Sequence, residues 1–294
     1  MITIDFFTMT INNPEILEKT YEYFYKNIKG WNLKDSTLYL NVDPHPDEIN
    51  LNNMKKIGEK YFKNVVFNVP NCCNCSAAFK WGISSFKSDY LFILEANKCI
   101  SKEFNILEMI QKFDINSNIV EVCLSPKRDN PLLKYLTSHP SIWKKEWLKQ
   151  IEKLLSPNIN YEYQLRELAL LFNKVGYTLA NPNNIYLLHI GKNYKEERKY
   201  LLANSSTDDE IINIIYKEGE WHQYILDHIE NMCEANNKIT DSNFQPNLEN
   251  LKQFKKKLND KDWQYRWIGV WKYVKNDNYY IRHLKKSNMY MCNK

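Results

Sequence analysis

The chain has 294 residues, of which 44% are hydrophobic and 14% aromatic, so it can bury a substantial core and does not have a disordered composition. Its formal net charge is only +5, and the basic residues form no concentrated stripe, which argues against a nucleic-acid-binding protein. The seven glycines form neither G-x-G-x-x-G nor G-x-x-x-x-G-K, which excludes the common dinucleotide and P-loop phosphate sites.

The sequence predicts a protein without a membrane segment. No stretch approaches the roughly 20 apolar residues of a membrane helix, and residues 1–13 lack the basic and apolar regions of a signal peptide. Seven cysteines, an odd number, favour a reducing compartment. Cys72, Cys73 and Cys75 are interpreted as free thiols, because no second pair follows at zinc-binding spacing. We therefore expect a cytoplasmic protein, in the host cytoplasm if the chain is viral.

The first third of the chain alternates between short apolar runs and amphipathic segments. The apolar runs predict strands and the amphipathic segments predict helices. The expected strands cover 2–8, 36–43, 64–71 and 89–95, and the expected helices cover 13–28, 49–62 and 75–86. Short connections between alternating strands and helices predict an α/β fold with a largely parallel sheet.

The regular alternation of predicted strands and helices ends after residue 100. We expect a helix over 101–113, a strand over 118–125, a short strand or turn and then a helix over 135–155, a helix over 160–176 closed by Gly176, and a last strand over 184–191 that carries His189. A polar segment follows, and we place a domain boundary between residues 204 and 205.

Residues 205–294 predict a mostly helical appendage. Trp263, Trp267 and Trp271 recur every four residues, which places them on one face of a helix. This face either packs on the main domain or serves as a platform for an acceptor, a membrane surface or a partner, and a homodimer is compatible with it.

Several segments of the first 204 residues, taken in order, resemble one known family. Asn74, Ala78, Trp81, Asp89 and Glu95 form a pattern that runs from a helix into a buried strand. The segments "FFTMTINN", "HPSIWKKEWL" and "LLHIG" and the carboxylate at Asp43 accompany it. Together they resemble the nucleotide-sugar domain of glycosyltransferases of the GT-A type. The resemblance implies a Rossmann-like, mixed and mostly parallel sheet flanked by helices, and a hexosyltransferase that uses a UDP- or GDP-linked sugar donor and a sugar or glycan acceptor.

The resemblance also implies a donor site at the carboxyl ends of the strands, where open α/β sheets bind ligands. The expected nucleotide-sugar-binding residues are Thr8, Thr10, Asp43, Asn71, Asn74, Trp81, Glu95, Ala96 and Asn97.

The sequence departs from the family in its acidic motif. Ala96 and Asn97 stand where the family has acidic residues, so the motif is degenerate. The resemblance implies Glu95, Asn97 and His189 as the candidate ligands for Mn²⁺ or Mg²⁺, and His189 is included because it matches a late histidine of the family. The oxygen atoms of Glu95 and Asn97 are of the type that these ions prefer. A metal-free enzyme would instead neutralise the diphosphate with lysine or arginine. The candidates for this role are Lys80, Lys98, Lys192 and Arg198. A catalytically inactive homologue that acts as a binding or scaffold protein is the alternative.

An inverting transfer needs a carboxylate that accepts the proton of the acceptor hydroxyl. The resemblance implies a base near the start of a helix, so Glu162 is the candidate, with Glu167 one to two turns later as the other choice. An acidic residue at a helix start also has a purely structural explanation in the helix dipole. A retaining mechanism stays open.

Overall fold

The computed structural model describes residues 2–10, 13–43, 48–71, 74–126, 140–157, 161–180 and 187–189. The chain divides into two compact units. The first comprises Met1–Cys73, Ala78–Glu152 and Val175–Lys192, and the second comprises Asn74–Ala77, Lys153–Lys174 and Asn193–Lys294. The predicted boundary after residue 204 and the predicted helical appendage lie outside the described residues. Within the described ranges, no helix is both long and apolar enough to span a bilayer.

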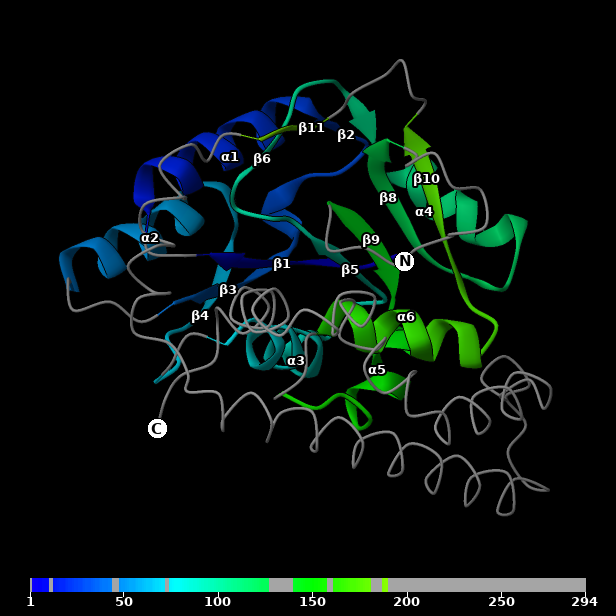
Figure 1. Ribbon diagram of the computed structural model, residues 1–294. Coiled ribbons are helices and arrows are strands. Elements are labelled where there is room, and N and C mark those ends of the chain that lie inside the picture. The colour runs from blue at the N-terminus through cyan, green and yellow to red at the C-terminus, as the bar shows by residue number, and fades with distance from the viewer. Residues whose placement is uncertain are drawn as a thin grey trace, which may run out of the picture. The chain divides into compact units, whose positions relative to one another are not determined.

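A seven-stranded sheet with the order β10-β8-β9-β5-β1-β3-β4 forms the centre of the first unit (Figure 1). In chain order the strands are β1 (Ile4–Thr10), β3 (Thr37–Val42), β4 (Asn64–Asn68), β5 (Tyr90–Ile93), β8 (Ile119–Pro126), β9 (Ser141–Lys144) and β10 (Val175–Ala180). Only β9 runs antiparallel to its neighbours, β5 and β8; the other adjacent pairs are parallel. This confirms the predicted α/β fold with a mixed, mostly parallel sheet.

The central strand β1 is buried on both faces, as its nearly continuous apolar sequence predicts. Side chains alternate between faces, so Phe6 and Phe7 point to opposite layers. The Phe6 ring lies 5.6 Å from the ring of Phe24, and the Phe7 ring lies 6.4 Å from the ring of Phe79. The strand therefore joins two separate aromatic cores.

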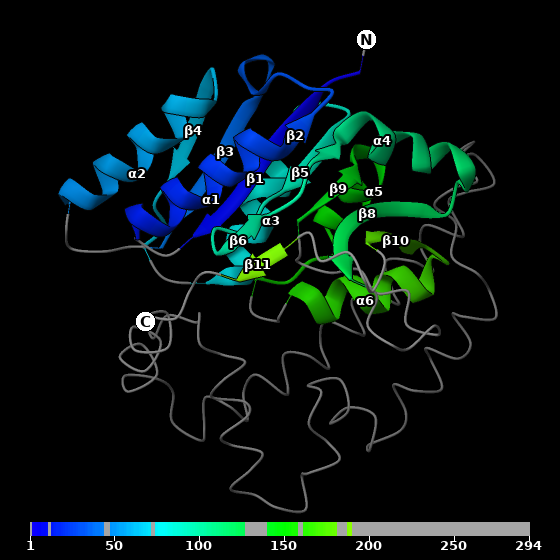
Figure 2. The ribbon, with the colours of Figure 1, turned by 90° about the horizontal axis from the view of Figure 1, so that it is seen from above.

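Helices cover both faces of the sheet (Figures 1 and 2). One face carries α1 (Pro14–Asn27), α2 (Glu48–Tyr61) and α4 (Ile106–Ile115), and the other carries α3 (Cys75–Ser85) and α5 (Lys145–Glu152). Gly82 allows α3 to lie directly on β1, because a Cβ at this position would come within 2.5 Å of the Phe7 ring. The two-layer covering explains why the inner strands β1, β3 and β5 are buried on both sides.

Two short ladders lie beside the main sheet. β2 (Ile28–Lys29) pairs in parallel with β7 (Phe104–Asn105), and β6 (Lys98–Ile100) pairs antiparallel with β11 (Leu187–His189). A 3-10 turn, η1 (Leu33–Asp35), precedes β3. The β6–β11 ladder directly follows the turn that the acidic motif occupies.

The structure corrects the predicted helix over 160–176. The helix α6 (Tyr161–Leu171) ends earlier, and Asn173, with a φ of 53°, adopts the left-handed conformation just beyond it. Gly176 does not cap a helix but lies inside β10, a strand that the sequence analysis did not predict. The predicted helix over 101–113 also starts later, at Ile106, where Asn105 accepts the Leu107 N–H at 3.0 Å.

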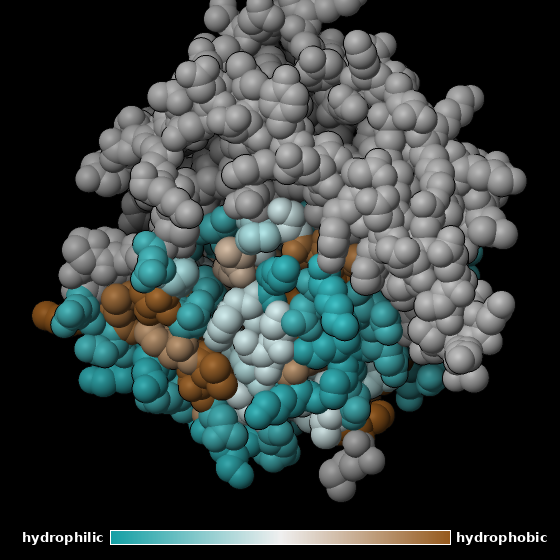
Figure 3. All heavy atoms as spheres, turned by 90° about the horizontal axis from the view of Figure 1, so that it is seen from below, coloured by the Kyte–Doolittle hydropathy of each residue, from teal (hydrophilic) through white to brown (hydrophobic). Residues whose placement is uncertain are grey.

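The described surface carries few large hydrophobic residues. Seven are exposed, and they are scattered over the elements: Ile2, Tyr25, Ile49, Val66, Ile115, Leu170 and Tyr177. On the face shown in Figure 3, hydrophobic residues lie in small groups among hydrophilic ones. Single exposed apolar residues are normal on a protein surface, so nothing in the described residues marks an apolar docking face.

Candidate functional site

The carboxyl ends of β3, β1 and β5 meet at one edge of the sheet, because these neighbouring strands are parallel. Beyond the ladder, the Asp43 N–H donates to the Thr10 carbonyl at 2.9 Å, and the Leu94 N–H donates to the Phe7 carbonyl at 2.9 Å. These hydrogen bonds continue the pairing with β1 to Asp43 and Leu94, one residue beyond the ends of β3 and β5. These are the positions where open α/β sheets bind ligands.

Asp43 is a half-buried carboxyl group at this edge. Burial raises its pKa from 3.8 to about 7, and a neighbouring charge is not the cause. A carboxyl group that titrates near neutral pH in a site for a polar ligand is a recognised sign of function. The predicted role of Asp43 in nucleotide-sugar binding is compatible with this position and stays a prediction.

The turn after β5 explains the degenerate acidic motif in physical terms. Ala96 is 7% exposed and belongs to the hydrophobic core, and its carbonyl accepts a hydrogen bond from the Thr20 hydroxyl at 2.5 Å. Glu95 and Asn97, on either side, are half-buried. A carboxylate at position 96 would therefore be buried in apolar surroundings, at a high cost in free energy. Only Glu95 and Asn97 remain as ligand candidates in this turn.

The backbone of His189 lies next to this turn. β11 pairs with β6 in a register that places His189 opposite Lys98, one residue beyond Asn97. The turn itself is closed by the Lys98 N–H, which donates to the Glu95 carbonyl at 3.2 Å. The backbone of His189 therefore lies beside the residue that follows the turn of Glu95 and Asn97.

Thr8, Thr10 and Trp81 are further predicted donor residues in the first unit. Thr8 is fully buried, and its hydroxyl faces Tyr21 of α1, so contact with a nucleotide would require this packing to open. Thr10 is 6% exposed at the end of β1. The half-buried Trp81 ring lies 6.1 Å from the Phe7 ring and 6.2 Å from the Tyr39 ring, so α3 fixes its place on the sheet.

Asn71 and Asn74 lie on either side of the undescribed residues 72–73. Asn71 is exposed after β4. Asn74 belongs to the second unit, where its side-chain oxygen accepts the Ala77 N–H at 2.9 Å and so caps α3. This helix cap is a structural role for Asn74 in addition to the predicted binding role.

Glu162 lies in the first turn of α6, as predicted, in the second unit. The Tyr161 N–H, one residue earlier, donates to the hydroxyl of Ser76 at 2.9 Å. The helix start that carries Glu162 is thus anchored by a buried serine. Glu167, the other candidate base, lies further along the same helix.

Sequence reasoning missed a pair of asparagines near the same edge. The Asn68 amide of β4 donates to the side-chain oxygen of Asn41 of β3 at 2.6 Å, and Asn41 is fully buried. Asn41 belongs to β3 and lies two residues before Asp43, which directly follows this strand. The signal for it was present, because an asparagine interrupts an apolar strand in "LNV", and buried amides need partners.

The candidate cations are only partly described. Lys80 and Lys98 are half-buried, whereas Lys192 and Arg198 lie outside the described residues. Within the described ranges, no group of three or more histidine, cysteine or acidic side chains could hold a metal ion. The oxygen atoms of Glu95 and Asn97 are of the type that Mn²⁺ and Mg²⁺ prefer, so the donor chemistry of the turn fits these ions.

No family model matches the chain, and no curated protein matches its sequence. A mannosyltransferase from Pyrobaculum calidifontis, described in complex with GDP-Man and Mn²⁺, is similar in structure at 7% identity, with a TM-score of 0.52, over 98% of this chain and 87% of that one. Residues 1–349 of TarS from S. aureus, in complex with UDP-GlcNAc, give a TM-score of only 0.48 at 11% identity, over 98% of this chain and 90% of that one. The chain therefore has a glycosyltransferase fold of the GT-A type.

Proposed function

We propose that this protein is a glycosyltransferase that moves a sugar from a nucleotide-sugar donor to an acceptor hydroxyl. The observation that carries the proposal is the edge of the sheet where β3, β1 and β5 end, because it brings together Asp43 and the turn of Glu95 and Asn97. The mannosyltransferase with a similar fold supports it, since its own structure holds GDP-Man and Mn²⁺.

In the proposed site the nucleoside binds between the ends of β1 and β3, with Asp43 at the base or ribose. The diphosphate lies towards the turn after β5. A leaving nucleoside diphosphate must be neutralised as the sugar–phosphate bond breaks.

Two means of neutralisation are proposed as alternatives. In the first, Glu95 and Asn97, with His189, hold a Mn²⁺ or Mg²⁺ ion, which supplies Lewis-acid stabilisation of the diphosphate. Asn97 contributes a neutral amide oxygen in place of a carboxylate, so we expect weak metal binding. In the second, lysine side chains near the strand ends, Lys80 and Lys98 among the described residues, replace the ion.

For the transfer itself we propose an inverting mechanism with Glu162 as the base. Its carboxylate would accept the proton of the acceptor hydroxyl while that oxygen attacks the anomeric carbon. The support is its place in the first turn of α6, the helix start at which the base was expected.

A non-catalytic binding protein on the same fold is the competing proposal. It rests on the degenerate acidic motif, and its predicted interaction surface, Trp263, Trp267 and Trp271, lies outside the described residues. This proposal predicts binding of a partner or self-association without turnover of any donor.

A thermal-shift series tests the glycosyltransferase proposal. UDP, GDP, CDP and dTDP are added with and without Mn²⁺ to the wild type, to Asn97→Ala and to the control Asn53→Ala, which changes an exposed residue of α2. We expect one nucleotide to raise the melting temperature. A Mn²⁺-dependent shift that Asn97→Ala abolishes and Asn53→Ala retains supports the metal-bound form.

A shift that depends on neither Mn²⁺ nor Asn97 supports the metal-free form. No shift with any nucleotide would contradict the proposal and favour the binding protein.

A further inference from the structure

Helix α1 forms a buried hydrogen bond to the turn that carries Glu95 and Asn97. The Thr20 hydroxyl donates to the Ala96 carbonyl at 2.5 Å, and Thr20 is fully buried. Thr20 lies in the middle of α1, where a serine or threonine hydroxyl ordinarily bonds to its own helix or to water. Here it bonds to a residue 76 positions away in the chain.

A second side chain of α1 holds the strand that follows the turn. The Asn27 amide donates to the Ile100 carbonyl at 2.6 Å in a buried contact, and also to the Tyr23 carbonyl at 3.0 Å. The buried thiol of Cys99, which lies between Ala96 and Ile100 in the chain, is 3.9 Å from the carbonyl of Lys19, the residue before Thr20. Helix α1 thus contacts β6 along its length, and β6 in turn pairs with the strand of His189.

The Thr20 contact fixes the direction of one functional side chain in particular. The carbonyl that accepts the hydrogen bond belongs to the peptide unit between Ala96 and Asn97. A peptide unit is planar, so a bond to its oxygen sets the orientation of the plane from which the Asn97 Cα leaves. Without the hydroxyl, the buried Ala96 carbonyl would lose its hydrogen-bond partner. The turn would then lower its free energy by rotating this carbonyl towards another donor.

We propose that Thr20 is a positioning residue that holds the Glu95–Asn97 turn in the orientation needed to bind the diphosphate of the donor. This inference rests on the proposed function, and it adds a residue on the opposite side of the turn from the ligand. Loss of a group that orients a metal ligand typically costs about 10–100-fold in metal affinity or activity.

The test compares three variants of the whole chain. Thr20→Val removes the hydroxyl at nearly constant volume, and Thr20→Ser keeps it. Ser36→Ala is the matched control: the buried Ser36 hydroxyl also donates to a main-chain carbonyl, that of Ile4, at 2.5 Å, but at the start of β1 instead of the carboxyl edge.

Two quantities are measured for each variant. The first is the ratio of affinities for a nucleoside diphosphate and its monophosphate, by titration calorimetry with Mn²⁺, using the nucleotide that stabilises the wild type best. The second is the hydrogen-exchange rate of the Lys98 N–H, which closes the turn on the Glu95 carbonyl and can be followed without any ligand.

We expect Thr20→Val to lower the diphosphate-to-monophosphate ratio about tenfold and to speed exchange at Lys98. Thr20→Ser should restore both values, and Ser36→Ala should change neither. An unchanged ratio in Thr20→Val, or an equal loss in Ser36→Ala, would overturn the inference, because the contact would then be merely structural.

If the wild type binds neither nucleotide, the proposed function fails and the donor role of Thr20 fails with it. The hydrogen-exchange rate of the Lys98 N–H distinguishes an error in the proposed function from an error in the role given to Thr20. Faster exchange at Lys98 in Thr20→Val alone would show that the turn is still held by Thr20, so the error would lie in the proposed function.

Discussion

At the scale of single residues, Asp43 combines a cost in stability with a place in the candidate site. Its carboxyl group is half-buried at the end of β3, and burial raises its pKa from 3.8 to about 7. Below pH 3.8 the folded and unfolded chains both hold this proton. Between 3.8 and 7 only the unfolded chain releases it, so the contribution of Asp43 lowers the free energy of unfolding as the pH rises through this window.

We therefore predict that Asp43→Asn is more stable than the wild type by about 1–3 kcal/mol at pH 8, with little difference at pH 4. The same variant should bind the nucleotide more weakly, as expected where function costs stability. Urea denaturation at both pH values and a nucleotide titration check this. Asp35→Asn, at an exposed position, is the control for the loss of one charge. A variant that is less stable than the wild type at pH 8 would contradict the argument.

Some residues of the candidate site could be recognised from the sequence, and others could not. Glu95 and Asp43 could be proposed because each follows an apolar run that predicts a strand, and Asn97 because it stands where the resembled family has an acidic residue. The burial of Ala96 and its bond to Thr20 could not, because Thr20 reads as an ordinary helix residue and its partner is distant in the chain. The asparagine at position 41 was visible inside an apolar strand, but its pairing with Asn68 was not, since the pairing depends on the register of β3 against β4.

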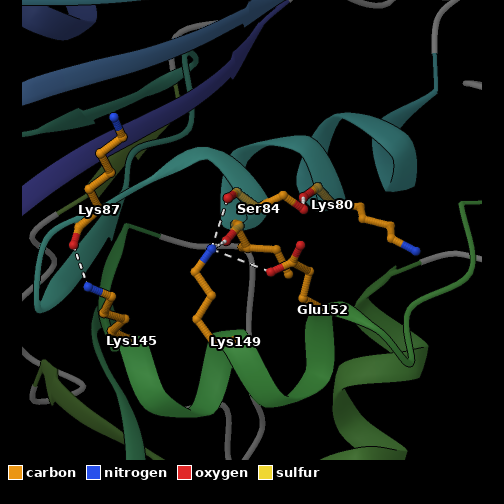
Figure 4. A network of polar contacts seen from close by, with 7 residues as sticks. Lys80, Ser84, Lys87, Lys145, Lys149 and Glu152 are labelled. Atoms are coloured by element: carbon orange, nitrogen blue, oxygen red, sulfur yellow. Dashed lines mark hydrogen bonds and ion pairs between the residues drawn. The ribbon is translucent and has the colours of Figure 1, made fainter.

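At the scale of elements, lysine side chains close two helices that end without a glycine. The Lys34 amine donates to the carbonyls of Glu59, Lys60 and Phe62, at 3.0–3.2 Å, at the end of α2. At the end of α3, the Lys149 amine donates to the carbonyls of Ile83 and Ser84 at 3.0 and 2.9 Å (Figure 4). A cation at a helix C-terminus satisfies carbonyls and complements the helix dipole.

Lys149 also joins α3 to α5, and we predict a measurable cost when its charge is removed. It pairs with Glu152 at 3.4 Å and lies 5.2 Å from the centre of the Phe86 ring. Lys149→Met keeps most of the aliphatic stem and should lower the free energy of unfolding by about 1–2 kcal/mol, as measured by denaturant unfolding. Lys55→Met, which removes an exposed ion pair with Glu59, should cost less than about 0.5 kcal/mol. Equal effects of the two variants would show that the cap at α3 contributes nothing.

Most elements could be predicted from periodicity, and the failures have physical causes. The helix predicted before β10 was extended into this strand because "NKVG" ends with glycine, a residue that often closes helices. The residue that leaves the helix is Asn173, which tolerates the left-handed conformation better than most residues other than glycine. β6 was missed because three residues are too few to show alternation, and β11, its strand partner among the described residues, is distant in sequence.

At the scale of the whole molecule, the sheet order is the property that a single sequence does not contain. Alternation predicts a parallel sheet, but the antiparallel insertion of β9 between β5 and β8 depends on contacts between distant segments. That insertion separates the parallel strands β5, β1, β3 and β4 from β8 and β10. The predicted fold class is confirmed, and the proposed chemistry rests on the edge of the first of these two groups.

The most direct test of the central claim is turnover of a donor. UDP- and GDP-linked hexoses are incubated with the protein and Mn²⁺ and followed by phosphorus NMR, with Glu95→Gln as the variant of the proposed site. We predict that one donor is slowly hydrolysed to its nucleoside diphosphate, and that Glu95→Gln loses this activity. Release of no nucleoside diphosphate from any donor, by a protein that also binds no nucleotide, would contradict the account.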